Sequence, residues 1–488
     1  QLVGFVGLFI VGIAYHVLPR FKNTELALPR LALPSIALVA AGAVLRAISQ
    51  PWADTDAIVV PLVASALLEL AGAAAFTAVV AVTLARAQRK NYDRYLLVAA
   101  VWFVAATAAN LWLVSEIARD GATVVAGSRD APLLEMYFFG FITLFVLGIS
   151  IRVLPHFVSL RPPQVRYFTP ALSIYSAGLL ARVGSGWLAA YSGWSQPDWL
   201  LAASIYAMAA GVLLFVFGLN LHRRAVRDAT SDAPGPHERL IRTAYVWLVI
   251  ALVIETWYAT KGVSGGFRPD FLENGAARHA LALGFVTQMI FGVGSRALPA
   301  FAGKKLHSEK LVTIAWVLIN MATVQRVGPA LFPWGSVTSR FDHIAAAGAL
   351  ALIALVIFGY NIMRTVRPPR RRRSPDRKEE NQMQLNARPP EQAYVVSADS
   401  IVADVIREVP GSLETLISYG FKPLADPELR ARVAGTVTLG MACDMHGVDV
   451  QALIADLTAL QHGGASTGQS PRQRIINALR DCYDPEIT

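Results

Sequence analysis

The sequence has little cysteine. Its 488 residues include only two, Cys443 and Cys482, and it contains no Cys-x-x-Cys pair and no cluster of cysteine with histidine. A covalently attached c-type haem and a four-cysteine iron–sulphur or zinc site are therefore excluded within one chain. A framework of disulfide bonds is equally unsupported.

Charged residues are also scarce. They make up 16% of the chain, whereas 54% of the residues are hydrophobic and the mean hydropathy is +0.45. Apolar runs of 18 to 27 residues recur along most of the length. This pattern is typical of an all-α polytopic membrane protein and not of one soluble core. The net charge of +10 does not indicate nucleic acid as a partner, because the basic residues lie mostly in short loops between apolar segments.

The apolar runs predict eleven membrane-spanning helices. They cover residues 1–19, 31–49, 58–84, 95–117, 133–155, 167–190, 198–221, 240–260, 277–299, 311–332 and 343–363. The loops alternate between basic and neutral or acidic, so the positive-inside rule places the basic loops and the C-terminus in the cytoplasm. We expect a multi-pass protein of the bacterial inner (plasma) membrane. The chain starts inside an apolar run without a signal peptide, and we expect one further helix before it.

One helix sequence occurs three times, and we call each copy a GF helix. The copies are "GFVGLFIVGIAYHVLPRF" from Gly4, "GFITLFVLGISIRVLPHF" from Gly140 and "GFVTQMIFGVGSRALPAF" from Gly284. In each copy, a second glycine lies eight residues after the first glycine, and a basic or imidazole side chain lies twelve residues after the first glycine. An arginine follows each first glycine by 42 residues; these are Arg46, Arg182 and Arg326.

The helix before the GF helix also repeats. "VWFVAATAANLWL" from Val101 matches "VWLVIALVIETWY" from Val246, which aligns Trp102 with Trp247. The repeating unit therefore has four helices with the GF helix second, and the first unit lacks its first helix. Because four is even, the units are parallel. We expect three such units, with 11 of 12 helices present, in a pseudo-threefold bundle.

Polar residues gather at the predicted outer ends of these helices, where the positive-inside rule calls for no arginine. His279 lies five residues before Gly284 and corresponds to Glu135 in the second unit. The same layer contains the three repeated arginines, Arg46, Arg182 and Arg326, with Glu255, Asp342 and His343. Imidazole ligates haem iron or copper, and arginine pairs with haem propionates. The layer therefore indicates a haem, with copper as a second candidate, although each histidine alone also fits a polar helix end.

The opposite ends of the GF helices carry His16, Arg152 and Arg296 near the predicted cytoplasmic face. Long basic side chains at this depth often anchor a helix by reaching the lipid headgroups. We keep His16 as a candidate metal ligand beside His279 and His343.

The segment "RHALALGFVTQMIFGVGSRALPAFAG", with "GFVGLFIVGIAYHVLPRF", resembles the NnrS family of bacterial membrane proteins over roughly residues 1–363. The resemblance implies a twelve-helix protein that contains haem and copper and is linked to denitrification and nitric-oxide stress, with nitric oxide as an expected ligand. It carries over His279 and Arg296 as members of the matching motif. The three fours of helices also resemble the haem–copper oxidase core, but the second GF helix has no histidine inside the bilayer, so a three-histidine copper centre is not expected.

The tail changes character after Met363. Residues 364–395 form a basic, disordered linker that starts at the membrane lipid, and 396–462 form a small helical domain. The latter resembles the N-terminal domain of ScdA iron-centre repair proteins, without the paired cysteines. After a linker at 463–471, residues 472–488 look like the truncated start of a SufT-like iron–sulphur assembly domain. Iron–sulphur proteins are therefore candidate partners of the tail.

Three functions fit these features. The first is a haem-binding protein of nitrogen-oxide metabolism, indicated by the outer histidine and arginine layer. The second is a transporter whose intramembrane arginines bind an anion or another small molecule. The third is a membrane scaffold for the cytoplasmic domains. Whether the protein is an enzyme stays open.

Overall fold

The computed structural model describes residues 2–158, 160–221, 235–267, 269, 271–332, 337–367, 394–435 and 437–461. The chain forms two compact units, 1–369 and 370–488. The predicted linker 463–471 and the SufT-like start 472–488 lie outside the described residues, as does most of the predicted linker 364–395.

The described part of the membrane unit, 1–369, is built from helices. The described residues of the chain form no β-strand; the tail contains one isolated β-bridge. Ten described helices are long and apolar enough to cross a membrane. The prediction of an all-α polytopic membrane protein is therefore confirmed. The one remaining predicted span, 167–190, is also a helix in the structure, but it is not among these ten.

The helices follow the predicted order. The first unit of the repeat contains η1 (Leu2–Gly7) running into α1 (Leu8–Lys22), then α2 (Pro29–Ser49) and α3 (Val59–Ala85). The second contains α4 (Asn91–Asp120), α5 (Gly127–Glu135) with η4 (Met136–Thr143) and α6 (Leu144–Phe157), α7 (Phe168–Ser192) and α8 (Asp198–Gly218). The third contains α9 (Pro236–Gly265), α10 (Phe271–His279) with η6 (Ala280–Thr287) and α11 (Gln288–Phe301), α12 (Glu309–Leu331) and α13 (Val337–Val366). Short 3₁₀ turns, η2 (Gln50–Trp52), η3 (Asp56–Ile58) and η5 (Val165–Tyr167), lie in the connections.

Each GF helix contains a π-helical segment at the same place. The segments η1, η4 and η6 end at Gly7, Thr143 and Thr287, three residues after the first glycine of each copy. A π-turn holds one more residue than an α-turn, so it rotates all following side chains by about 100° around the helix axis. Such segments occur often at functional sites.

The glycines of the GF helices let them lie directly on the preceding helix. A Cβ atom on Gly284 would lie 2.5 Å from the Cβ of Trp247, and one on Gly140 would lie 2.7 Å from the ring of Trp102. These two tryptophans occupy the same position in their units. No residue larger than glycine fits at this contact without displacing an indole.

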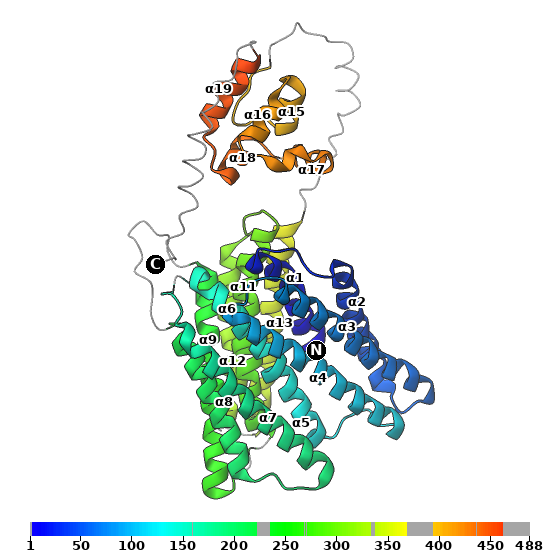
Figure 1. Cartoon of the computed structure of the whole chain (residues 1–488). Helices are drawn as coiled ribbons and strands as arrows, with labels where there is room; N and C mark the ends of the chain where they lie inside the picture. Colours follow the sequence, from blue (N-terminus) through cyan, green and yellow to red (C-terminus); the bar gives the residue numbers. More distant parts are fainter. Residues whose placement is uncertain are drawn as a thin grey trace. The chain divides into compact units, whose positions relative to one another are not determined.

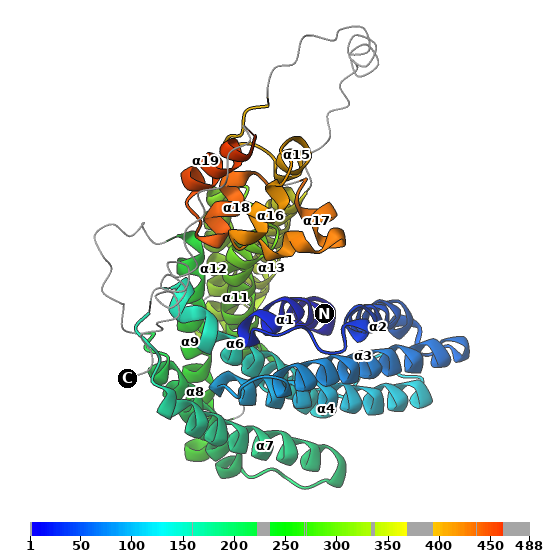
Figure 2. The same ribbon diagram turned by 45° about the horizontal axis from the view of Figure 1, so that its top comes forward.

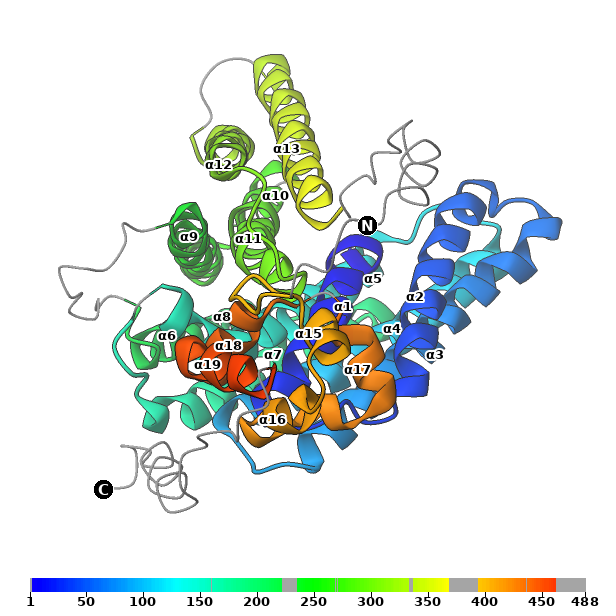
Figure 3. The ribbon, with the colours of Figure 1, turned by 90° about the horizontal axis from the view of Figure 1, so that it is seen from above.

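Neighbouring helices pack as hairpins, and the units join through their outer members. The pairs α2 and α3, α7 and α8, and α12 and α13 each pack side by side (Figure 1). Figure 2 shows α2, α3 and α4 in one row, so α3 connects the first unit to the second. In the view of Figure 3, α9, α11, α12 and α13 gather in one group. Among these ten helices, the one that contains the second GF helix is the most enclosed. In it, 83% of the residues in its apolar 18-residue stretch are buried, against 17% for the span that contains α2.

The described residues of the tail unit form six short helical elements with their own core. They are α15 (Val402–Glu408), α16 (Ser412–Ser418), η7 (Lys422–Ala425), α17 (Pro427–Val433), α18 (Leu439–His446) and α19 (Val450–Gln461). The core includes Val405, Leu416, Leu439, Leu453 and Leu457, all fully buried. The elements lie within the range predicted for the small helical domain.

Candidate functional site

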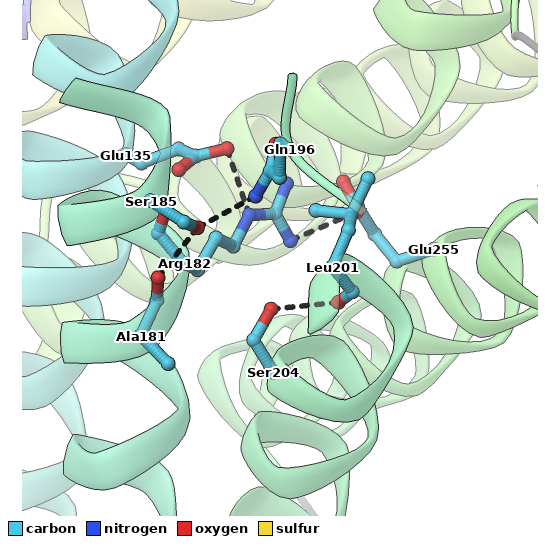
Figure 4. A network of polar contacts seen from close by, with 8 residues as sticks. All are labelled: Glu135, Ala181, Arg182, Ser185, Gln196, Leu201, Ser204 and Glu255. Carbon is cyan, nitrogen blue, oxygen red and sulfur yellow. Dashed lines mark hydrogen bonds and ion pairs between the residues drawn. The ribbon is translucent and has the colours of Figure 1, made fainter. Parts of the chain in front are cut away.

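Arg182 of α7 lies between two carboxylates. Its Nε donates to Oε1 of Glu135 at 2.7 Å, and its Nη1 donates to Oε2 of Glu255 at 3.0 Å (Figure 4). Glu135 ends α5, whereas Glu255 lies on α9 in the next unit. The arginine side chain is 11% exposed. The ion pairs therefore join the second and third units in a place from which most water is excluded.

This network lines a cavity of about 440 Å³. The lining includes Glu135, Arg182 and Glu255, and adds Asp198, Glu273 and Arg278. Four carboxylates thus face two guanidinium groups, which favours a cationic or hydrogen-bond-donating molecule over an anion. Arg182 already has two carboxylate partners, so it is poorly placed to hold a haem propionate.

A second cavity, of about 680 Å³, lies at the junction between the first and second units. It is lined by Arg46 of α2, Glu69 of α3, Asn110 of α4 and Tyr137 of η4. Asn110 Nδ2 donates to Glu69 Oε2 at 3.0 Å. Asn110 holds the same repeat position as Glu255, so both junctions place a repeat-equivalent polar side chain near the repeated arginine.

Two residues that line this second cavity have a buried polar atom without a hydrogen-bond partner among the described residues. Arg46 Nε donates to Gln50 Oε1 at 2.7 Å, but Arg46 Nη1 has no such partner. The Tyr137 hydroxyl also has none among the described residues, and Tyr137 is only 5% exposed. Unpaired buried donors cost stability unless a ligand or water satisfies them.

In the third unit, His279 has one ring nitrogen engaged. Its Nδ1 lies 2.6 Å from the carbonyl oxygen of Gly275, one turn earlier in α10. Because a carbonyl only accepts, Nδ1 carries the proton and Nε2 keeps its lone pair. Metal-binding histidines are commonly fixed by such a backbone bond. Arg326 and Arg278 lie close enough for their charges to act on the imidazole.

The other predicted ligands do not join His279. His343 is exposed near the start of α13, and His16 is exposed on α1, where its ring lies 5.3 Å from the ring of Phe301. Phe301 follows His279 by 22 residues in one continuous run of helix, which corresponds to about 33 Å. Across the part of the chain that the structure describes, no three His, Cys, Asp or Glu side chains come close enough to hold a metal ion.

The remaining predicted basic residues at that far end are exposed. Arg152 on α6 and Arg296 on α11 both have exposed side chains, as expected of membrane anchors. Neither lines the two polar cavities.

A buried ion pair at the far end of α1 escaped sequence reasoning. Lys22 Nζ lies 2.6 Å from Asp93 Oδ2, with side chains 1% and 8% exposed. The pair connects α1 to the start of α4. Both residues lie at loop edges, where charge is expected from topology alone, so only their opposite signs could have indicated the contact.

The comparisons with known families agree with this architecture. The profile for a domain of unknown function (DUF1858) matches residues 396–454. No curated protein matches the chain. The profile named NnrS protein matches residues 1–370, which is well over half of the sequence. The chain therefore belongs to the NnrS family.

Proposed function

We propose that this membrane protein binds haem through His279 and acts in the nitric-oxide stress response and denitrification. Its family links it to the nitric oxide response. The observation that carries the haem proposal is the bond from His279 Nδ1 to Gly275, because it leaves Nε2 as a fixed ligand. The basic loops support a bacterial inner membrane location with the tail in the cytoplasm.

In this proposal a haem would have one protein ligand, His279. The charges of Arg326 and Arg278 act on the imidazole, and guanidinium groups bind carboxylates such as propionates in a bidentate manner. A bound haem would supply an iron that can bind a diatomic gas. The residues fit copper less well, because the described residues contain no group of three ligating side chains.

The test is the visible spectrum of the purified full-length protein. We expect a Soret band that shifts on addition of nitric oxide, that is lost in His279→Ala, and that persists in His343→Ala and His16→Ala. Arg326→Gln should lower haem affinity about tenfold, the loss expected for one charge-assisted bond. A wild-type protein without a Soret band, or an unchanged spectrum in His279→Ala, would contradict the proposal.

A second candidate function is anion binding or transport at the first junction. Arg46 favours it, because its Nη1 is buried and unpaired among the described residues, and Arg46 and Tyr137 both line the second cavity. This function predicts flux of a small anion in proteoliposomes that Arg46→Gln abolishes. Equal flux in Arg46→Gln and wild type would rule it out.

A further inference from the structure

The three GF helices meet around a third, apolar cavity. It has a volume of about 50 Å³ and is lined by side chains of these three helices only. Nine of the lining residues form three sets that share one offset from the first glycine: Phe9, Phe145 and Met289; Ile10, Val146 and Ile290; Ile13, Ile149 and Val293. The cavity therefore lies where repeat-equivalent faces of the three units come together.

The lining offers nothing to water. Every lining residue is apolar, and one set, Ile13, Ile149 and Val293, is at most 9% exposed. An ordered water needs two to four polar partners, so a cavity of this chemistry stays dry. By the same measure a water occupies about 10–15 Å³, so 50 Å³ admits a molecule somewhat larger than water.

The same features of the three helices surround this space. In the second and third units, the first glycine lies directly against Trp102 or Trp247 of the preceding helix. The nine repeat-equivalent lining residues all follow the π-helical segments, which set the rotation of their side chains around the helix. Because residues at the same three offsets line the gap in every GF helix, it does not result from one poorly packed side chain.

We propose that this cavity binds an uncharged, apolar molecule of diatomic size, as a dissolved gas is. Apolar molecules prefer hydrocarbon to water, so such a ligand enters from the bilayer without crossing a polar barrier. His279 does not line this cavity; the lining residue nearest to it in the sequence, Val286, follows it by 7 residues in one helix, about 10 Å along the axis. The inference goes beyond haem binding and does not depend on it.

Xenon is the probe, because it matches the ligand in size and lack of charge. In xenon-129 NMR, we expect full-length protein in detergent micelles to show saturable binding above the linear partition into the micelle. Val293→Phe places a ring in the cavity and should weaken this binding at least tenfold. The matched control Leu352→Phe, at a side chain 62% exposed on α13, should bind as the wild type does.

Two further variants keep the outcome decisive. Ile149→Ala enlarges the cavity and should retain saturable binding, and it also serves if Val293→Phe does not fold. His279→Ala should bind xenon normally, which separates this inference from the haem proposal. Xenon uptake that rises only linearly in the wild type and in Ile149→Ala would overturn the inference, as would wild-type binding in folded Val293→Phe.

Discussion

Arg182 belongs to the second unit of the repeat, but its two ion-pair partners come from the second and the third units. Its partners, Glu135 and Glu255, come from α5 and α9 and are 20% and 19% exposed. A buried arginine with two carboxylates need not stabilise a fold relative to apolar packing. Removing only one member of the network, however, leaves an uncompensated charge at a largely buried position. The network therefore fixes which faces of the two units meet.

Replacing Arg182 should destabilise the protein strongly. Arg182→Gln leaves two nearby carboxylates without their cation, and we expect the free energy of unfolding to fall by about 3 kcal/mol. Denaturant unfolding in detergent measures it. Arg407→Gln is the control, because that arginine is 67% exposed and solvent screens its ion pairs, so its loss should change the free energy of unfolding little.

A double-mutant cycle separates the ion pair from packing. Adding Glu135→Gln to Arg182→Gln removes one of the two unpaired carboxylates. The double variant should therefore lose less free energy of unfolding than the two single variants lose in sum. Additive losses would mean that the 2.7 Å contact between Arg182 and Glu135 contributes no coupling.

At this scale the sequence predicted charge better than it predicted hydroxyls. Arg182, Glu135 and Glu255 were expected in one layer because intramembrane charge is costly and rare. The place of Tyr137 in the first junction could not be predicted, since a tyrosine in an apolar run gives no sign of whether its hydroxyl is paired. The partial burial of His279 and the exposure of His343 depend on how α10 and α13 turn, which sequence spacing does not fix.

Among the elements, the GF helices of the second and third units lie very close to the preceding helix at their glycines. Second glycines repeat the pattern of the first: a Cβ on Gly148 would lie 2.9 Å from Leu96, and one on Gly292 would lie 2.8 Å from Ile241. Leu96 and Ile241 are again repeat-equivalent. Each GF helix of the second and third units is thus seated on its neighbour at two points.

Filling one of these seats should loosen the third unit. Gly284→Ala places a methyl group against Trp247, and we expect a loss of about 1–3 kcal/mol in the free energy of unfolding. Gly359→Ala on α13, where a Cβ meets nothing within 4 Å, should be neutral or stabilise by up to about 1 kcal/mol. Thermal unfolding of the two variants side by side gives the answer.

A smaller partner offers the check on that explanation. Trp247→Leu in the Gly284→Ala background should recover part of the loss, although it also removes the bond from Trp247 Nε1 to Asn320 Oδ1 at 2.8 Å. If the combined variant is worse than either single one by the full sum, contact between the methyl group and the indole is not the cause.

Helix positions were largely predictable and helix type was not. The length of an apolar run sets where a helix crosses the bilayer, so the predicted span 133–155 lies inside the observed run from Gly127 to Phe157. A π-turn differs from an α-turn by one residue in the hydrogen-bond ladder and leaves no mark on composition. The segments η4 and η6 were therefore invisible in the sequence.

For the whole molecule, the threefold arrangement of the repeat units stays a prediction. Such an arrangement would bring repeat-equivalent side chains together, and the apolar cavity is lined by such side chains.

The predicted tail domain has its own core, which shares no residue with that of the membrane unit. Burial of the Cys443 thiol, together with nearby Asp444 and Asp449, raises its pKa.

The tail should protect Cys443 chemically. Because only the thiolate reacts, a raised pKa and full burial should slow alkylation by iodoacetamide at pH 8 at least tenfold relative to unfolded protein, with the rate rising at higher pH. The experiment uses full-length protein carrying Cys482→Ser. In Met441→Cys, the new thiol replaces a side chain that is 60% exposed and should react quickly. Equal rates in native and denatured protein would show that the domain is not closed.

The ion pairs of Arg182 also impose an order on biogenesis. Glu255 follows Arg182 by 73 residues, which a ribosome adding about 5–20 residues per second makes in roughly 4–15 s. During that interval Glu135 is the only one of the two carboxylate partners that exists for Arg182. The ion pair between the second and third units can therefore form only after the first helix of the third unit has been synthesised.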